Sequence, residues 1–503
     1  MPGLNSSLQI GLTALQASQA ALNVVGHNIS NVNTPNYSRQ RAILVNNASQ
    51  TFGNMQFGSG VNLNNILGVR DRFLEMQITQ ATSRQSGSDA RYAGVEGISP
   101  VFNEDGSEAA LGTQVQRFFQ SFQDLSARPE DGALRTNLIG KAQSLVNGLK
   151  SRYQLLTDQR NQADRNIGSL VTEINTITAE IAKLNTRIAT EPSKGADSDA
   201  RDQRQGLANR LAGLVGIQVF QDSKEQLQIT LDSGAAALVS GNTAYTMTAT
   251  ADAGLGNYNR VDIVLASGAP IDVTGAIREG ALGGNLDLRD NVLAGYQRKL
   301  DELAAGIAGQ VNLVHRGGYA LNGVTTGTDF FLGTAANYAA SNLPLGQVAG
   351  LPTTVSSLNN YRGMVNALSV NAAVVANPGL IAAADAAGAV GNNQNARNLA
   401  NLQTSNNAVD TNGDGVGDSG PYGTFVGSLV NTIGTQAQGF RTRSTGDENL
   451  LAALQTQRDR VSGVDLDEEA TNMMAFQRGY QASARFITVI NQLTDQLVNQ
   501  FGR

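Results

Sequence analysis

The sequence contains no cysteine, no tryptophan and only two histidines among its 503 residues. The absence of cysteine excludes disulfides, thiol catalysis and cysteine-ligated metal sites. The histidines, His27 and His315, are too far apart for the paired-histidine helix of a zinc protease. We expect His27 to pack or to cap at the end of a helix. We expect His315 to be a cation that the helix dipole favours at a helix C-terminus.

Charge and long apolar runs are also scarce. The chain has 36 Lys and Arg against 42 Asp and Glu, a net charge of -6, and no basic block. Because nucleic-acid binding depends on clustered Lys and Arg, we expect no nucleic-acid partner. No apolar run approaches the ~20 residues that cross a bilayer, and residues 1–11 lack the pattern of a signal peptide, so we expect no membrane association.

Sequence patterns of common enzymes are missing as well. The chain has no Gly-x-Ser-x-Gly elbow and no Gly-Lys-Ser or Gly-Lys-Thr phosphate loop, and Gly283-Gly284 indicates only a turn. We therefore expect no enzymatic activity and no organic cofactor.

Both ends of the chain have the apolar periodicity of coiled-coil helices. Thr34-Pro35 ends the first helix, and Asp465 is a plausible N-cap of the last, with Glu468 at the capping-box position. Few charges support these helices, so we expect them to pair and to become ordered on assembly into a polymer. The two predicted assembly seams consist of Leu8, Leu15, Leu22 and Ile29 and of Met473, Phe476, Tyr480, Ile487, Ile490 and Leu497.

The middle of the chain predicts a long helix and then short strands. Apolar residues recur three and four apart from Ile167 to Ile188, before Pro192, and the helix begins soon after the turn at 128–132. After Gly216, short β-branched runs predict strands. The predicted fold is mainly α with inserted β: paired terminal coiled-coil helices, a long helical-bundle rod domain and a small outward all-β domain. The expected domains are 1–60 with 463–503 (terminal helices), 61–215 with 280–462 (rod, including the loop-rich 317–420) and 216–279 (inserted β).

One loop has the spacing of a calcium site. Asp410, Asn412, Asp414 and Asp418 occupy positions 1, 3, 5 and 9 of an EF-hand-like loop. Position 12, where such a loop needs a bidentate Glu, is Pro421. Two readings therefore remain open, a calcium site and a solvated turn rich in Asp and Asn.

The most specific motif is Asn28–Gln40, which contains Asn31, Thr34, Pro35 and Tyr37. On physical grounds it is a helix end followed by a turn. The motif resembles the signature of the flagellar rod and hook axial protein family. Ser30 and Asn36 stand where that family frequently has Ala and Gly, and Asn tolerates left-handed backbone geometry as Gly does.

Other stretches strengthen this resemblance. Residues 462–485 contain the Gln-Arg-Gly-Tyr-Gln-Ala core of the family. The preceding Asp-Glu-Glu-Ala at 467–470 is similar to the subunits that join hook and filament rather than to the hook protein. Residues 199–216, 280–289 and 329–331 agree with the same subunits.

The resemblance implies a structural subunit of the bacterial flagellum. It would be exported unfolded through the flagellar type III apparatus with an export chaperone, and it would form the extracellular junction between hook and filament. Its partners would be further copies of itself, the hook protein below, and a second junction protein and then the filament above. Two alternatives are a hook or distal-rod protein, which the helix from Ile167 to Ile188 disfavours, and a secreted calcium-binding surface protein.

Overall fold

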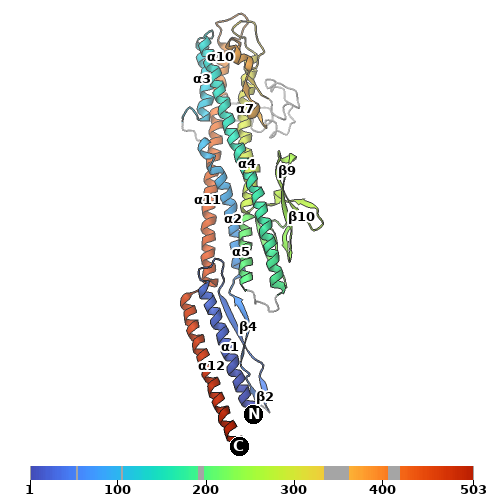
Figure 1. Ribbon diagram of the computed structural model, residues 1–503. Coiled ribbons are helices and arrows are strands. Elements are labelled where there is room, and N and C mark those ends of the chain that lie inside the picture. Colours follow the sequence, from blue (N-terminus) through green and yellow to red (C-terminus); the bar gives the residue numbers. More distant parts are fainter. Residues whose placement is uncertain are drawn as a thin grey trace. The chain divides into compact units, whose positions relative to one another are not determined.

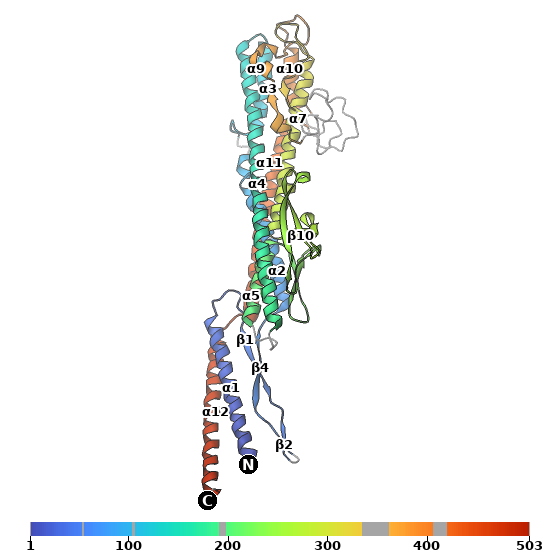
Figure 2. The same ribbon diagram turned by 45° about the vertical axis from the view of Figure 1, so that its right-hand side comes forward.

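The computed structural model describes residues 2–52, 55–102, 106–190, 198–333, 362–405 and 420–501 (Figures 1 and 2). The chain divides into two compact units. Unit 1 comprises residues 1–87, 168–283 and 444–503, and unit 2 comprises residues 88–167 and 284–443. The prediction of a mainly α fold with inserted β structure and paired terminal helices is confirmed. The three-domain division remains a prediction.

Long amphipathic helices dominate the described chain. The helices are α1 (Pro2–Ser30), α2 (Arg72–Glu96), α3 (Leu111–Ala127), α4 (Gly132–Thr190), α5 (Ser198–Leu214), α6 (Gly280–Asp287), α7 (Leu293–Arg316), α8 (Met364–Ala367), α9 (Ala372–Ala376), α10 (Gln394–Asn401), α11 (Tyr422–Ser462) and α12 (Leu466–Phe501). The predicted long helix corresponds to α4, whose repeat residues Ile167, Ile174 and Ile181 are fully buried. Asp465 caps α12 as predicted, since its Oδ1 accepts hydrogen bonds from the backbone N of residues 467 and 468 at 2.9 and 3.2 Å.

Unit 1 contains two antiparallel hairpins between α1 and α2. The strands are β1 (Gln40–Asn46), β2 (Gln50–Phe52), β3 (Met55–Phe57) and β4 (Val61–Gly68). β1 pairs with β4, with a register shift between Ile43 and Leu44, and β2 pairs with β3. The apolar periodicity of the sequence did not predict these strands.

The β segment after Gly216 forms two sheets in unit 1. Its strands are β5 (Ile217–Gln221), β6 (Leu227–Leu231), β7 (Ala237–Ser240), β8 (Thr243–Ala244), β9 (Thr246–Asp252), β10 (Tyr258–Val264) and β11 (Pro270–Asp272), in the orders β5-β6-β7-β8 and β11-β10-β9. Two asparagines of α4 hold both sheets. Asn175 exchanges two 2.8 Å hydrogen bonds with the backbone of Met247, and Asn185 bonds the backbone N and O of Leu227, both at 2.9 Å. The strand prediction for this segment is confirmed.

The core of unit 2 includes a group of phenylalanines. Phe118 and Phe122 of α3 pack against Phe330 and Phe331, with ring centroids 5.5–6.0 Å apart in the contacting pairs. Asn312 of α7 supports this packing, since its Oδ1 accepts from the backbone N of both Phe330 and Phe331 at 2.9 Å. The described part of 317–420 has only short elements, namely α8, α9, α10, β12 (Phe331–Leu332) and β13 (Ser369–Val370).

His315, at the end of α7, differs from the expectation. Its side chain is fully buried, and burial lowers its pKa to about 4, so the ring is neutral at neutral pH rather than a cation. Nδ1 lies 2.7 Å from the carbonyl of Thr328, and Nε2 accepts from the backbone N of Ala382 at 3.0 Å. A neutral imidazole with hydrogen on Nδ1 satisfies both contacts.

The Gly283-Gly284 pair also differs, because it lies inside helix α6 and not in a turn. A Cβ on Gly283 would lie 2.4 Å from the carbonyl carbon of Arg278. Close packing of the backbone therefore requires glycine here.

Candidate assembly site in the terminal helices

Helices α1 and α12 pack against each other within unit 1 of a single chain (Figures 1 and 2). Among the buried residues of α1, Gly11, Ala17 and Ala21 are small, and Val24, Val25 and Asn28 are larger. A Cβ on Gly11 would lie 2.8 Å from Cγ1 of Ile487 on α12. Small residues thus allow the two helices to approach closely.

The predicted seam residues are unequally covered in this pair. On α12, Ile490 is buried, Met473, Phe476, Ile487 and Leu497 are half-buried, and Tyr480 is exposed. On α1, Leu15, Leu22 and Ile29 are half-buried, and Leu8 is exposed. The seams therefore lie partly at the contact between the helices and partly at the surface. Their role in contacts between subunits stays a prediction.

The Asn28–Gln40 motif is centred on the buried amide of Asn28. Its Nδ2 donates to the carbonyl of Gln40 at 2.9 Å and to Glu469 Oε2 at 3.1 Å. Its Oδ1 accepts from Gln40 N at 2.9 Å and from the Tyr37 hydroxyl at 2.8 Å. Burial, with the nearby carboxylates of Asp199 and Glu469, raises the pKa of Tyr37, so its hydroxyl remains a donor. Asn28 therefore ties α1, β1 and α12 together with all four of its amide hydrogen bonds.

The remaining motif residues shape the turn between α1 and β1. Asn31 Nδ2 donates to the carbonyl of His27 at 3.0 Å, and the Thr34 hydroxyl donates to Asn31 Oδ1 at 3.0 Å. Pro35 is exposed. Asn36 has a φ of 62°, a left-handed geometry that Asn tolerates in place of Gly. The predicted helix end and turn are confirmed.

The last three residues of the motif bind α12 and α5. Arg39 forms an ion pair with Glu468 of α12, the residue at the predicted capping-box position. The backbone N of Ser38 donates to Asp202 Oδ2 of α5 at 3.2 Å. Gln40 Nε2 donates to Asp199 Oδ1 at 3.0 Å. We call the connected set the motif cluster; it comprises Asn28, Tyr37, Ser38, Arg39, Gln40, Arg70, Asp199, Asp202, Glu468 and Glu469.

The motif cluster joins three stretches that are distant in sequence. These are Asn28–Gln40, the 199–216 stretch and the 462–485 stretch, each of which carries the family resemblance. Arg70 is a member that sequence reasoning missed. Its Nε donates to Ser38 Oγ at 3.0 Å and its guanidinium pairs with Asp202, but it lies in no motif and no periodic pattern.

His27 lies beside the motif cluster. Its Nε2 is 3.2 Å from Asp199 Oδ1, and its ring meets that of Tyr37 edge-on, with centroids 5.6 Å apart. It is packed at a helix end, as expected.

The described residues were searched for a metal site and for a membrane-spanning helix. The predicted calcium ligands Asp410, Asn412, Asp414 and Asp418 lie outside them. Within residues 2–52, 55–102, 106–190, 198–333, 362–405 and 420–501, no group of three or more His, Asp or Glu is placed to hold a metal ion. In the same ranges, no helix has the length and hydropathy to cross a bilayer.

Three family models match parts of the chain. Residues 95–331 match the flagellar hook-associated protein FlgK helical domain. Residues 455–500 match the C-terminal region of the flagellar basal body rod FlgEFG proteins, and residues 8–37 match the flagella basal body rod protein. The two rod matches therefore fall on α12 and α1.

Whole proteins are similar over nearly the full length. The flagellar hook-associated protein 1 of Salmonella typhimurium (strain LT2) is 30% identical over 555 aligned positions, covering 99% of this chain and 100% of that protein. The protein of the same name from Escherichia coli (strain K12) is 28% identical, with the same coverage. Among solved structures, the flagellar hook junction protein FlgK from Burkholderia pseudomallei superposes with a TM-score of 0.63 at 17% identity. That superposition covers 77% of this chain and 100% of the other, and it shows a shared fold.

Proposed function

Because the chain belongs to the flagellar hook-associated protein 1 family, we propose that α1 and α12 are the segment through which its subunits contact one another in the flagellum. The chain is a structural component of the bacterial flagellum, at the junction between hook and filament. The proposal concerns which surfaces make that junction.

The observation that carries the proposal is apolar surface left uncovered on the paired helices. Leu8 and Leu12 of α1 are 36% and 46% exposed, and Val489 and Leu493 of α12 are 51% and 45% exposed. Since small residues such as Gly11 let α1 approach α12 closely, the exposed side chains of Leu8 and Leu12 remain available to a neighbouring subunit. Burying them in a subunit contact would stabilise the assembly.

The family also suggests the neighbours. We propose contacts with further copies of this chain, with the hook protein on one side, and with a second junction protein and then the filament on the other. Such contacts join different surfaces of successive subunits, as in any helical stack. We also propose type III export with a chaperone, an extracellular position, and no catalytic role. Calcium binding at Asp410–Asp418 stays a proposal of its own.

Paired substitutions in the source bacterium test the use of α1. Leu8→Gln with Leu12→Gln keeps helix propensity and side-chain size but makes the exposed face polar. Each leucine still has about 40% of its surface to bury, so the change removes roughly 1 kcal/mol per leucine at every subunit contact. We expect a folded, exported chain and cells with few filaments, counted by electron microscopy.

Leu313→Gln is the matched control. Leu313 lies on α7 of unit 2 and is 45% exposed, like Leu12, but is not on the terminal helices. Its change should leave filament number unaltered. Normal filaments in the double variant would refute the proposal for α1.

A further inference from the structure

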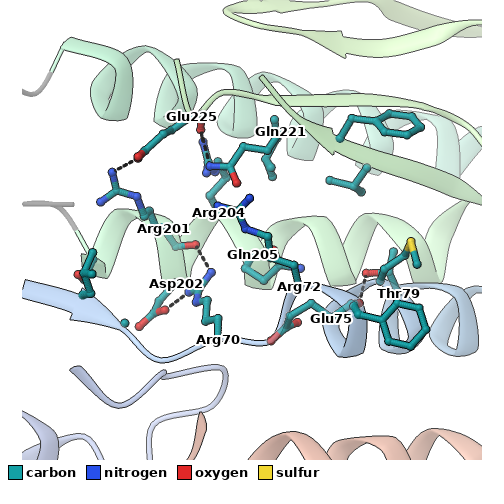
Figure 3. A pocket seen from close by; sticks show the side chains of 18 residues that line it. Arg70, Arg72, Glu75, Thr79, Arg201, Asp202, Arg204, Gln205, Gln221 and Glu225 are labelled. Carbon is teal, nitrogen blue, oxygen red and sulfur yellow. Dashed lines mark hydrogen bonds and ion pairs between the residues drawn. The ribbon is translucent and has the colours of Figure 1, made fainter. Parts of the chain in front are cut away.

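A cavity of about 620 Å³ opens in unit 1 beside the motif cluster (Figure 3). The end of β4, the start of α2, helix α5 and strand β5 contribute its walls. We call it the arginine pocket. Four arginines line the pocket: Arg70, Arg72, Arg201 and Arg204. Only three carboxylates line it, those of Glu75, Asp202 and Glu225, which leaves an excess of one positive charge.

Three of the arginines are already engaged within the chain. Arg70 pairs with Asp202, Arg201 pairs with Glu225, and Arg204 donates to Asn185 Oδ1 at 2.8 Å. Burial, together with the like charges of Arg201 and Arg70, lowers the pKa of Arg204 to about 10. An anion entering the pocket would relieve this crowding of positive charge.

One buried donor and one exposed cation remain for an anionic ligand. The NH1 of Arg201 is buried without a hydrogen-bond partner among the described residues, and so is Oε2 of Glu75. Arg72 is exposed at the mouth of the pocket. The unmet donor of Arg201 and the excess positive charge favour a carboxylate ligand, whereas the Glu75 oxygen is an acceptor and does not contribute to binding it.

The rim of the pocket is apolar. Phe73, Met76 and Phe220 line the cavity, yet they are 63%, 45% and 56% exposed. Exposed aromatic side chains around a charged pocket are typical of a protein-binding surface. The ligand should therefore present an apolar side chain next to its carboxylate.

We propose that the arginine pocket receives the exposed first turn of α12, Leu466-Asp467, from a neighbouring copy of this chain. Leu466 is 50% exposed, and Asp467 is exposed beside it. Neither residue lines the pocket of its own chain in the described structure. Asp467 would pair with Arg72, and Leu466 would pack on the rim. The inference rests on the proposed assembly of copies through the terminal helices.

The absence of native cysteine allows a direct test by cross-linking. The source bacterium would carry Phe220→Cys and Leu466→Cys in one chain, and isolated flagella would be oxidised. Cysteines bridge only when their Cα atoms come within about 7 Å, so covalent dimers and higher multimers are expected. The control chain, Val324→Cys with Leu466→Cys, should stay monomeric on a denaturing gel. Assembled flagella without cross-links would overturn the inference while leaving the proposed function intact, whereas a wild-type chain absent from flagella would overturn both.

A second measurement keeps the inference testable if the cysteine variant does not assemble. A labelled peptide of residues 462–471 is titrated with the purified full chain, and binding is followed by fluorescence anisotropy. Arg72→Gln should weaken binding about tenfold, and Arg210→Gln, an exposed arginine of α5 outside the pocket, should leave it unchanged. No binding at millimolar peptide, or equal binding by the Arg72 variant, overturns the inference.

Discussion

Lowering the pH from 7 to 5 should destabilise unit 2 through one side chain, His315. The imidazole is fully buried at the end of α7, and burial lowers its pKa from 6.5 to about 4. In the folded chain Nε2 accepts a hydrogen bond from Ala382 N, and protonation would replace this lone pair with a second donor. The unfolded chain takes up a proton readily below pH 6.5, and the folded chain does not.

The magnitude follows from the two pKa values. A histidine whose pKa is depressed by folding stabilises the fold fully above its unfolded pKa, and this contribution is lost as pH falls from 6.5 to 4. The difference between 6.5 and about 4 corresponds to a total of roughly 3 kcal/mol, of which about 2 kcal/mol is lost by pH 5.

The titration of His315 can be measured directly because the chain has only two histidines. In a His27→Gln chain, His315 is the only imidazole, so NMR of selectively labelled histidine reports its titration without ambiguity. The ring should remain neutral, with hydrogen on Nδ1, down to about pH 5. Urea unfolding of this chain and of a chain that also carries His315→Gln should show a stability difference that shrinks by about 2 kcal/mol between pH 7 and pH 5. An imidazole titrating near 6.5, or a difference independent of pH, would refute the reasoning.

Two other predictions concern acidic residues. Asp301 is buried and accepts from the backbone N of Gly363 and Val365 at 2.9 Å, and burial raises its pKa to about 6. Its effect has the opposite sign to that of His315, because the stabilising contribution of Asp301 is complete below about pH 4 and is lost as pH rises through 6. In urea unfolding, wild type should therefore lose up to roughly 3 kcal/mol of stability relative to Asp301→Asn over that range. If the Asp410–Asp418 loop binds calcium, the ion should raise the melting temperature of wild type but not that of Asp414→Ala. Equal responses of the two chains would identify the loop as a solvated turn instead.

Local periodicity predicted the helices well because a helix contact recurs every three or four residues. The repeat from Ile167 to Ile188 and the cap at Asp465 are examples, since each depends on neighbours within one turn or two. The pairing of β1 with β4 was missed for a physical reason. Val61 and Leu63 alternate with asparagine, but the register shift opposite Ile43 and Leu44 leaves Asn64 unpaired, which breaks the alternation within β4.

Long-range environments could not be predicted from local sequence. His315 is neutral because the fold buries it, with Ala382 and Thr328 as the partners of its two ring nitrogens. Gly283 is required because of the nearby backbone of Arg278. Only part of the candidate site could be predicted from the sequence. The motifs named the stretches that meet, but the bond between Asn28 and Glu469 joins residues 441 positions apart, and the membership of Arg70 appears only in three dimensions.

The hydrogen bond from Asn28 to Glu469 also has a consequence for the order in which the chain can fold. Unit 1 takes residues from the beginning, the middle and the end of the chain. A ribosome adding about 5–20 residues per second needs roughly 20 to 90 s to reach Glu469 after Asn28. During that time α1 has no α12 to pack on, and its small-residue face cannot be buried there. Such late closure suits the proposed export of an unfolded subunit, because the first helix cannot pack on α12 until α12 has been synthesised.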